Sequence, residues 1–368
     1  MRIGLDGMPL AQSRTGVGTY TFELARALAS AAPEDEFALI SPLPFAETVP
    51  ADPGPVNLEL IYSQPNLFQR RWWTVGLPAY LKRNPPALFH GTNYEVPLRA
   101  QCPTIVTIHD LSLLLHSSTH EARAVRRARL LMPLMARKAN LIITPSEPIK
   151  SDVCEHLKVG REKVFATPLA PRSTFKPMTT AETLPIRRRL QIEDQFLLFV
   201  GTIEPRKNLS TLLLGLEEIV RHTDLRPQLV IAGKVGWKAD EVLAQLKRLP
   251  VDRVRLVGFV SDEDLCALYS SCCAFIYPSL YEGFGLPPLE AMACGAPVIA
   301  SRVPSIKESV ARIISATDSK GLARNVIELL RDEQARRSLS QLGRKHAQEF
   351  SWQRTATLTR EVYAQALR

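Results

Sequence analysis

Residues 277–297 read Tyr-Pro-Ser-Leu-Tyr-Glu-Gly-Phe-Gly-Leu-Pro-Pro-Leu-Glu-Ala-Met-Ala-Cys-Gly-Ala-Pro. The apolar run at 274–277 and the two glycines after it indicate a short buried strand followed by a tight loop. The consecutive prolines at 287–288 predict a helix start, because the first N–H groups of a helix have no intrahelical partner. We expect this helix to end near Gly295 and a new strand to open at 297–300. The unit is therefore strand, glycine loop, helix and strand.

The glycine loop of this unit has the features of a ligand site. Backbone N–H groups at a helix start are free and the helix dipole is positive there, which favours an anion or a polar sugar. Two carboxylates frame the loop, Glu282 directly before Gly283 and Glu290 one turn into the helix. The stretch therefore predicts a ligand site with hydrogen-bond acceptors at both ends.

The bulk composition is that of a globular protein long enough for two domains. Of its 368 residues 45% are hydrophobic, and no apolar run approaches the roughly 18–20 residues that span a bilayer. Residues 1–6 carry no secretory signal and the six cysteines show no metal-ligand spacing, so we expect a cytoplasmic protein with reduced thiols. The formal charge of +9 favours polyanionic partners: nucleotide diphosphates, anionic lipid or nucleic acid.

Strand-like and helix-like segments alternate along the chain, which predicts α/β domains with mostly parallel sheets. The alternation stops at residues 171–192, where prolines and three consecutive arginines indicate an irregular linker. We therefore expect an N-terminal domain over residues 1–170, a C-terminal domain over residues 193–350, and a last amphipathic helix. Strands are expected at 2–5, 37–40, 58–61, 88–90, 104–108, 141–144, 195–200, 228–232, 254–257, 274–277 and 297–300.

Gly16-Val-Gly18 is expected in a loop between the first strand and a helix from Thr19, where ligands of open α/β sheets bind. A dinucleotide fingerprint needs a third glycine at position 21, which is Thr21 here. It also needs an acidic residue at the end of the second strand, whereas Asp35-Glu36 precedes that strand. An NAD-linked oxidoreductase is therefore a weak alternative, and a tight turn without a ligand explains the glycines equally well.

Arg206 and Lys207 follow the first expected strand of the C-terminal domain and precede a helix expected over 209–221. Cations and a helix dipole at that position both favour a phosphate, whereas a lone Arg-Lys pair is usually solvated surface. His109-Asp110 also ends an expected strand, and a loop histidine bonded to its neighbour is the plainer explanation there.

Two basic segments suggest peripheral contact with an anionic membrane such as the inner face of the cytoplasmic membrane. Gln69-Arg-Arg-Trp-Trp73 mixes cations with aromatic rings, and Arg123, Arg126, Arg127 and Arg129 crowd one expected helix. The same segments are compatible with solvated surface and two tryptophans in the core. No base-stacking platform accompanies them, so we expect no nucleic-acid partner.

Together these motifs resemble the retaining glycosyltransferases of family 4, which have the GT-B fold. The matching segments are Glu282-x7-Glu290 with its internal Gly-Phe-Gly-Leu-Pro, Gly201-Thr-Ile-Glu-Pro-Arg-Lys-Asn208, Gly16-Val-Gly18 and Thr107-Ile-His-Asp110. The resemblance covers essentially the whole chain. It implies two Rossmann-like parallel-sheet domains facing across a cleft, with residues 351–368 crossing back to the N-terminal domain.

Carried over to this sequence, the resemblance implies a donor site with Arg206 and Lys207 at a diphosphate, Glu290 at the ribose and Glu282 at the transferred sugar. His109 would lie near the sugar and the leaving phosphate, and it completes the expected catalytic set with Arg206, Lys207 and Glu282. Backbone contacts are expected at Gly16 and Gly18 (diphosphate and acceptor), Gly201 and Thr202 (donor), Val260 (nucleobase), and Gly283, Phe284, Gly285 and Leu286 (sugar).

The implied reaction moves a sugar from a nucleotide-diphosphate sugar to a hydroxyl of a saccharide or lipid-linked saccharide, with retention and no metal or cofactor. The segments at Leu5–Leu10 and His90–Asn93 resemble bacterial mannosyltransferases of O-antigen and exopolysaccharide assembly, which favours GDP-mannose. A UDP-sugar or another GDP-sugar is the alternative, and a non-catalytic nucleotide-sugar-binding protein is a further one. The sequence departs from the family pattern after Glu308, where the segment before the next strand is short, and at Glu147-Pro148.

Overall fold

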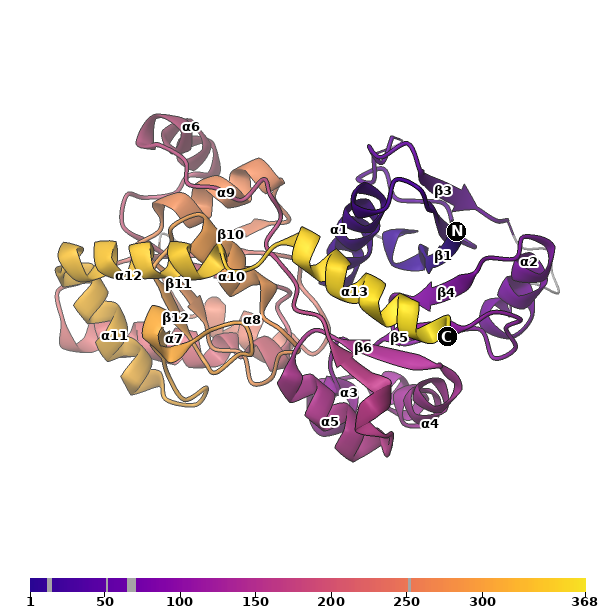
Figure 1. The fold of residues 1–368 in the computed structure, drawn as a ribbon. Coiled ribbons are helices and arrows are strands. Elements are labelled where there is room, and N and C mark those ends of the chain that lie inside the picture. Colours follow the sequence, from indigo (N-terminus) through magenta and orange to yellow (C-terminus); the bar gives the residue numbers. More distant parts are fainter. Residues whose placement is uncertain (12–14, 51, 65–70, 251–252) are drawn as a thin grey trace. The chain divides into compact units, whose positions relative to one another are not determined.

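The computed structural model describes residues 1–11, 15–50, 52–64, 71–250 and 253–368. These residues form two compact units, each built on a parallel sheet with helices packed on it (Figure 1). One unit comprises Met1–Leu114, Arg123–Leu169 and Ser351–Arg368, and the other comprises Leu115–Ala122 and Ala170–Phe350. The predicted fold class, two Rossmann-like parallel-sheet domains, is confirmed.

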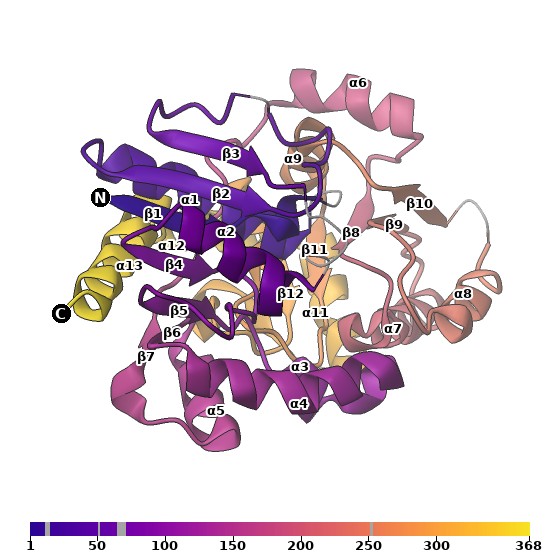
Figure 2. The ribbon, with the colours of Figure 1, turned by 90° about the vertical axis from the view of Figure 1, so that its right-hand side faces the viewer.

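In the described part of the chain, the first sheet has seven strands in the order β3-β2-β1-β4-β5-β6-β7, which Figure 2 shows one after another. The chain runs from β1 outward to β3 and then returns to the other side of β1 with β4. Along residues 1–169 the elements are β1 (Arg2–Asp6), η1 (Met8–Ala11), α1 (Gly16–Ala31), β2 (Glu36–Ser41), β3 (Leu58–Tyr62), η3 (Trp72–Gly76), α2 (Leu77–Arg83), β4 (Leu88–Gly91), β5 (Thr104–Thr107), α3 (Ser112–Leu115), η4 (Ser117–Thr119), α4 (Ala122–Lys138), β6 (Leu141–Thr144), α5 (Glu147–Leu157), η5 (Arg161–Lys163) and β7 (Val164–Ala166).

Helix α1 begins at Gly16 and not at Thr19, so the prediction of a loop at Gly16-Val-Gly18 is wrong. The Gly18 N–H donates to Oγ1 of Thr15 over 3.1 Å, which makes Thr15 the N-cap of the helix. Both glycines therefore lie in the first helical turn. Residues 12–14 of the expected loop lie outside the described residues.

Among the described residues, the second sheet has six strands in the order β10-β9-β8-β11-β12-β13. The strand order reverses between β8 and β11, which are parallel neighbours. Along residues 170–350 the elements are α6 (Thr180–Leu190), β8 (Phe196–Val200), η6 (Pro205–Lys207), α7 (Leu209–His222), β9 (Gln228–Ala232), α8 (Asp240–Leu246), β10 (Val254–Gly258), α9 (Asp262–Ser271), β11 (Ala274–Tyr277), α10 (Leu286–Ala293), β12 (Val298–Ala300), η7 (Glu308–Val310), β13 (Arg312–Ile313), α11 (Ser319–Arg331) and α12 (Glu333–Ala347).

Part of the expected irregular linker at 171–192 is the helix α6, which corrects that prediction. A capping box starts the helix: the Thr179 N–H donates to Oε2 of Glu182 over 2.7 Å, and the Glu182 N–H donates to Oγ1 of Thr179 over 3.4 Å. Helix α6 also packs against α9. These contacts outweigh the lost hydrogen bond at Pro185, which lies inside the helix.

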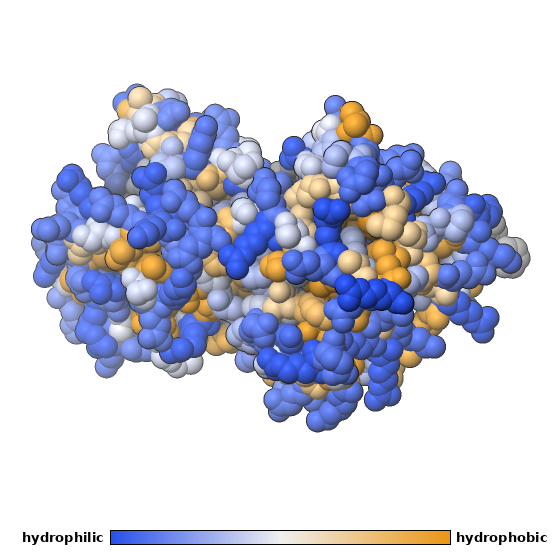
Figure 3. Space-filling model, viewed as in Figure 1, coloured by the Kyte–Doolittle hydropathy of each residue, from blue (hydrophilic) through white to orange (hydrophobic). Residues whose placement is uncertain are grey.

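The surface on the face shown in Figure 3 is mostly hydrophilic, and hydrophobic residues occur there in small separate groups. The core of the second unit lies between its sheet and covering helices, with Leu212 of α7, Ile231 of β9 and Leu322 of α11 fully buried. Within the described residues, no helix combines the length and the apolar character needed to cross a membrane.

The last helix, α13 (Trp352–Ala366), packs against α1 in the first unit. Buried hydrogen bonds continue from it into the sheet. The Tyr363 hydroxyl lies 2.7 Å from Nδ1 of His90, whose Nε2 lies 2.8 Å from Oγ1 of Thr107. Tyr20 of α1 reaches the same threonine oxygen over 2.8 Å. Burial lowers the pKa of His90 to about 3, so its ring is neutral at neutral pH.

Replacing Tyr363 with Phe is expected to lower the melting temperature, because it removes the partner of a buried ring nitrogen of His90. A buried polar group left without its hydrogen bond costs roughly 1–3 kcal/mol. Tyr62→Phe is the matched control, since Tyr62 is exposed at the end of β3, and it should leave the melting temperature unchanged. Equal melting temperatures for the two variants would contradict the buried network.

Candidate active site

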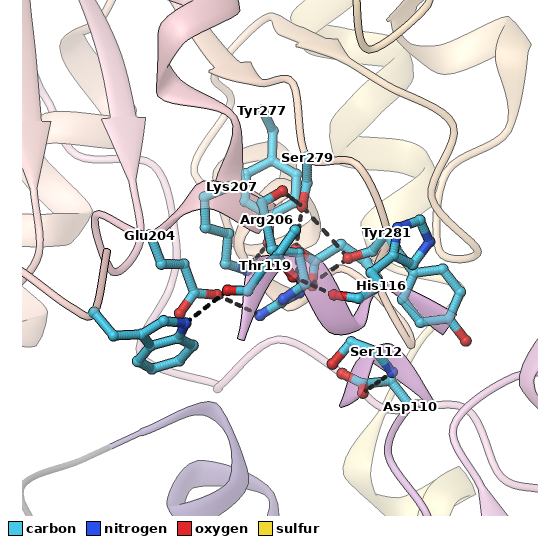
Figure 4. Close-up of polar contacts among 12 residues, drawn as sticks. Asp110, Ser112, His116, Thr119, Glu204, Arg206, Lys207, Tyr277, Ser279 and Tyr281 are labelled. Atoms are coloured by element: carbon cyan, nitrogen blue, oxygen red, sulfur yellow. Dashed lines mark hydrogen bonds and ion pairs between the residues drawn. The ribbon is translucent and has the colours of Figure 1, made fainter. Parts of the chain in front are cut away.

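The carboxyl ends of β8 and β11 bring two cations onto one carboxylate. Nζ of Lys207 lies 2.6 Å from Oε1 of Glu282, and Nη1 of Arg206 lies 3.0 Å from the same oxygen. Figure 4 shows Arg206 and Lys207 close to Tyr277 and Ser279 of the neighbouring strand end. Open α/β sheets bind ligands where the strand order reverses, and in the second sheet this is the β8–β11 edge. Three of the sequence-predicted catalytic residues therefore meet at the expected place.

The backbone holds these two segments together although they lie far apart in the sequence. The Leu280 N–H donates to the Arg206 carbonyl over 2.9 Å. The Asn208 side-chain amide donates to the Pro278 carbonyl over 3.0 Å. A Cβ atom on Gly233, at the end of β9, would lie 2.1 Å from the Gly201 carbonyl oxygen, so only glycine fits this approach. The position of Lys207 is thus set by main-chain contacts on both sides.

Burial and charge make this cluster electrostatically strong. The side chains of Arg206, Lys207 and Glu282 are only 13%, 12% and 10% exposed. Burial acts to raise the pKa of Glu282, but the charges of Lys207 and Arg206 overcome it and lower that pKa to about 2. Burial also lowers the pKa of Lys207, and Glu282 opposes this effect. Because Glu282 is ionised at neutral pH, it can accept hydrogen bonds but cannot serve as a general acid.

A second carboxylate, Glu204, joins these three residues, and we call Glu204, Arg206, Lys207 and Glu282 the ion cluster. Two hydroxyl groups contact this cluster. Glu204 lies 2.8 Å from Nη2 of Arg206, so two cations face two carboxylates. Nζ of Lys207 also donates to the Tyr277 hydroxyl over 2.7 Å, and Oγ of Ser279 donates to Glu282 over 2.5 Å. The cluster therefore holds two fixed positive charges in a desolvated place while its net formal charge is zero.

The glycine loop at 283–286 is supported by residues that the sequence did not indicate. Gly285 has a φ of 96°, and a Cβ there would lie 3.0 Å from Oγ of Ser305. The Ser305 hydroxyl donates to the Gly285 carbonyl over 3.0 Å, and its N–H donates to the Phe284 carbonyl over 3.0 Å. Nε2 of the buried His346 lies 2.8 Å from the Ser305 carbonyl. Ser305 and His346 therefore hold the loop that precedes α10 in place.

Glu290 lies in a different cluster from Glu282. Its side chain is buried, and Oε1 lies 3.3 Å from Nε of Arg172, which also pairs with Asp262 over 2.6 Å. Arg172 comes from the segment expected to be a linker, and no local motif marks it. In the same unit, Gly258 at the end of β10 has a φ of 67°, a Cβ on it would meet nothing within 4 Å, and Phe259 is 62% exposed. Val260 follows in the same turn.

Residues 115–122 also belong to this unit, which the sequence did not predict. The His116 ring lies 4.9 Å from the Tyr281 ring, next to Glu282 in the chain (Figure 4). Nε1 of Trp237 donates to the Thr119 carbonyl over 2.8 Å. The His120 ring also stacks on the Trp237 ring at 5.7 Å, and Nζ of Lys238 donates to the Ser118 carbonyl over 2.7 Å, so ring contacts and hydrogen bonds both hold the segment.

His109 lies in the first unit, at the end of β5. Its Nε2 is 2.8 Å from the Thr92 carbonyl. Its ring makes T-shaped contacts with the rings of Tyr20 and Tyr94, with centroids 4.8 and 5.8 Å apart. Burial lowers the pKa of His109. A Cβ on Gly18 would lie 3.2 Å from the Pro9 carbonyl, whereas one on Gly16 would meet nothing within 4 Å.

The basic segments considered for membrane contact are partly structural. Gln69 and Arg70 lie outside the described residues. Trp72 is buried against Phe89 and its neighbours, and Arg127 of α4 pairs with Glu95. Membrane contact therefore stays a prediction.

Comparisons with known proteins decide the family. A family model described as Glycosyltransferase Family 4 matches residues 14–169, and one described as Glycosyl transferases group 1 matches residues 182–346. O-antigen chain mannosyltransferase B of Escherichia coli is 31% identical over 99% of this chain and 99% of its own length. This chain is a family 4 glycosyltransferase. The family predicted from the motifs is confirmed.

Solved structures show that this glycosyltransferase shares its fold with others. Sucrose-phosphate synthase of Thermosynechococcus elongatus matches with a TM-score of 0.78 and 23% identity over 99% of this chain and 98% of that chain. HepE of Anabaena, solved in complex with UDP-glucose, matches with a TM-score of 0.77 and 17% identity over 99% of both chains. At these identities the similarity establishes the fold alone.

Replacing Glu282 with Gln in the glycosyltransferase is expected to lower the melting temperature at pH 7, because it leaves two buried cations without their shared carboxylate. Breaking a buried pair in this way costs roughly 3–5 kcal/mol. The matched control is Glu333→Gln, whose pair with Arg337 is exposed and is expected to contribute at most about 1 kcal/mol.

The pH dependence of the same variant gives a second readout. The folded-state pKa of Glu282 is about 2, below its ordinary value of 4.5. The stabilisation that Glu282 contributes is therefore complete above about pH 4.5 and is lost as the pH falls toward 2. The difference in melting temperature between wild type and Glu282→Gln should therefore shrink from about pH 5 to about pH 3. A difference that stays constant over this range would contradict the assignment.

Proposed function

We propose that this enzyme transfers mannose from GDP-mannose to a hydroxyl of a saccharide or lipid-linked saccharide, with retention and without a bound metal. The observation that carries the proposal is the ion cluster, in which Arg206 and Lys207 are buried and held by Glu282. Negative charge grows on the diphosphate as it leaves, and fixed cations in a water-poor site stabilise it. Mannose is supported by the name of the Escherichia coli relative, which this chain matches along its whole length.

In this proposal the donor's diphosphate lies on Lys207 and Arg206, and the transferred sugar lies beside Glu282 and the amides of 283–286. Glu282 already touches both cations, so a sugar bound to it would lie next to the phosphate it leaves. Deprotonation of the acceptor hydroxyl is assigned to the leaving phosphate, because the pKa of Glu282, about 2, makes that carboxylate a poor base.

The nucleoside is assigned to Glu290 and to the turn after β10. Glu290 is held in place by Arg172, and carboxylate oxygens accept hydrogen bonds of the kind that ribose hydroxyls donate. The turn at residues 258–260, in which Phe259 is exposed, would offer backbone groups to the base. A UDP-sugar is the second candidate donor, favoured by the UDP-glucose in the HepE complex. An NAD-linked reaction ranks below both, because position 21 is Thr21 and α1 lacks the third glycine.

A thermal-shift panel of GDP, UDP, ADP, dTDP and NAD tests the donor. A ligand that binds only the folded state at 100 times its dissociation constant stabilises it by about 2.7 kcal/mol. We expect the largest rise in melting temperature with GDP. A rise with UDP alone would replace GDP-mannose by a UDP-sugar, and a rise with NAD alone would overturn the transferase donor site.

Lys207→Ala is expected to lower the turnover number roughly 10²–10³-fold, as loss of one charge-stabilising donor does elsewhere. Lys234→Ala is the matched control, because Lys234 is an exposed lysine at the end of the next strand, β9. Product formation from GDP-mannose and a saccharide acceptor measures both. Wild-type turnover in Lys207→Ala would contradict the proposed role of the ion cluster.

A further inference from the structure

A hollow of about 470 Å³ opens at the carboxyl ends of β11, β12 and β13. We call it the β12–β13 hollow. Sites for small molecules have volumes of roughly 300–1,000 Å³. None of the four residues of the ion cluster lines it, so it is a separate space in the same unit. The lining residues used below are Ser279, Leu280, Ser301, Arg302, Ile313 and Ser315.

The charge of the lining favours a neutral ligand. Arg302 pairs with Glu308, which also lines the hollow, so these two charges cancel. Both side chains are exposed at the rim, and no further charged side chain is among the lining residues. A phosphate or carboxylate ligand would therefore find no unbalanced positive charge here.

The hydrogen bonds of the lining favour a ligand that donates. The Ser301 hydroxyl donates to the Ser279 carbonyl, and the Ser279 hydroxyl donates to Glu282. Each hydroxyl has a single hydrogen, so toward a ligand these oxygens can only accept. Sugar hydroxyls can donate to them, whereas the dianion of a phosphate monoester only accepts. Leu280 and Ile313 add an apolar surface for the C–H groups of a sugar ring.

The hollow shares its walls with the ion cluster. Ser279 lines the hollow and contacts Glu282 over 2.5 Å. Asn208 directly follows Lys207 in the chain, and its side-chain amide donates over 2.5 Å to the carbonyl of Ala316, which also lines the hollow. Ala311 is the single residue between η7 and β13, so the chain has no spare length there to fold over the hollow.

We propose that the β12–β13 hollow binds a hexose unit of the acceptor saccharide. This inference rests on the proposed saccharide acceptor and adds a binding subsite for it. The subsite is separated by Ser279 from Glu282, the residue assigned to the transferred sugar. A saccharide held there would keep the growing chain next to the donor and would favour longer acceptors over single sugars.

The test measures binding of an α-linked mannotetraose to the nucleotide-free enzyme by calorimetry. Ser315→Trp places a large side chain at the exposed edge of the hollow and is expected to weaken binding at least tenfold. Thr317→Trp, at an exposed position two residues on that does not line the hollow, should bind like wild type. Arg302→Ala changes only an 81% exposed side chain and should weaken binding several-fold with the fold intact.

GDP binding separates this inference from the proposed function. All three variants should keep the wild-type rise in melting temperature with GDP. Wild-type tetrasaccharide affinity in Ser315→Trp, or no tetrasaccharide binding to the wild type, would overturn the subsite even if GDP binds and transfer occurs. Binding of inorganic phosphate that Ser315→Trp abolishes would instead show an anion site. A wild-type enzyme that neither binds GDP nor transfers a sugar would contradict the proposed function itself.

Discussion

The candidate site of the second unit depends on burying Arg206 and Lys207 while both side chains stay positively charged. Burying a charged lysine or arginine without a carboxylate partner is costly, and here Glu282 pairs with Lys207 and Arg206 while Glu204 pairs with Arg206. Because Lys207 and Glu282 are 75 residues apart in the chain, this ion cluster also joins the ends of β8 and β11. One set of ion pairs thus links two segments distant in the sequence and sets the charges of the candidate site.

The glycine loop beside the cluster is held in place by residues that are distant from it in the sequence. Ser305 uses its N–H and its hydroxyl on the carbonyls of Phe284 and Gly285, and His346 holds Ser305 from behind. The loop before α10 is therefore ordered by contacts within the protein itself. Preorganisation of this kind is what makes fixed dipoles effective on a developing charge.

The sequence predicted the parts of the site that follow local rules. Arg206, Lys207 and Glu282 lie in the segments that follow apolar strands, and parallel strands bring their carboxyl ends to one edge of the sheet. Arg172, Ser305 and His346 could not be predicted, because they reach the site through contacts distant in sequence and carry no motif. The prolines near α6 favour an irregular segment, although the capping-box residues Thr179 and Glu182 indicate a helix start. Thr15 is likewise a typical N-cap residue, and it marks the start of α1, which the apolar pattern places at Thr19.

A crystal structure of the enzyme with GDP bound tests the role of the ion cluster most directly. We expect a diphosphate oxygen within about 3 Å of Nζ of Lys207, the distance of a charge-assisted hydrogen bond, with Glu290 at the ribose. A diphosphate bound elsewhere, with the ion cluster unchanged, would contradict the assignment of Lys207 and Arg206 to the donor phosphates.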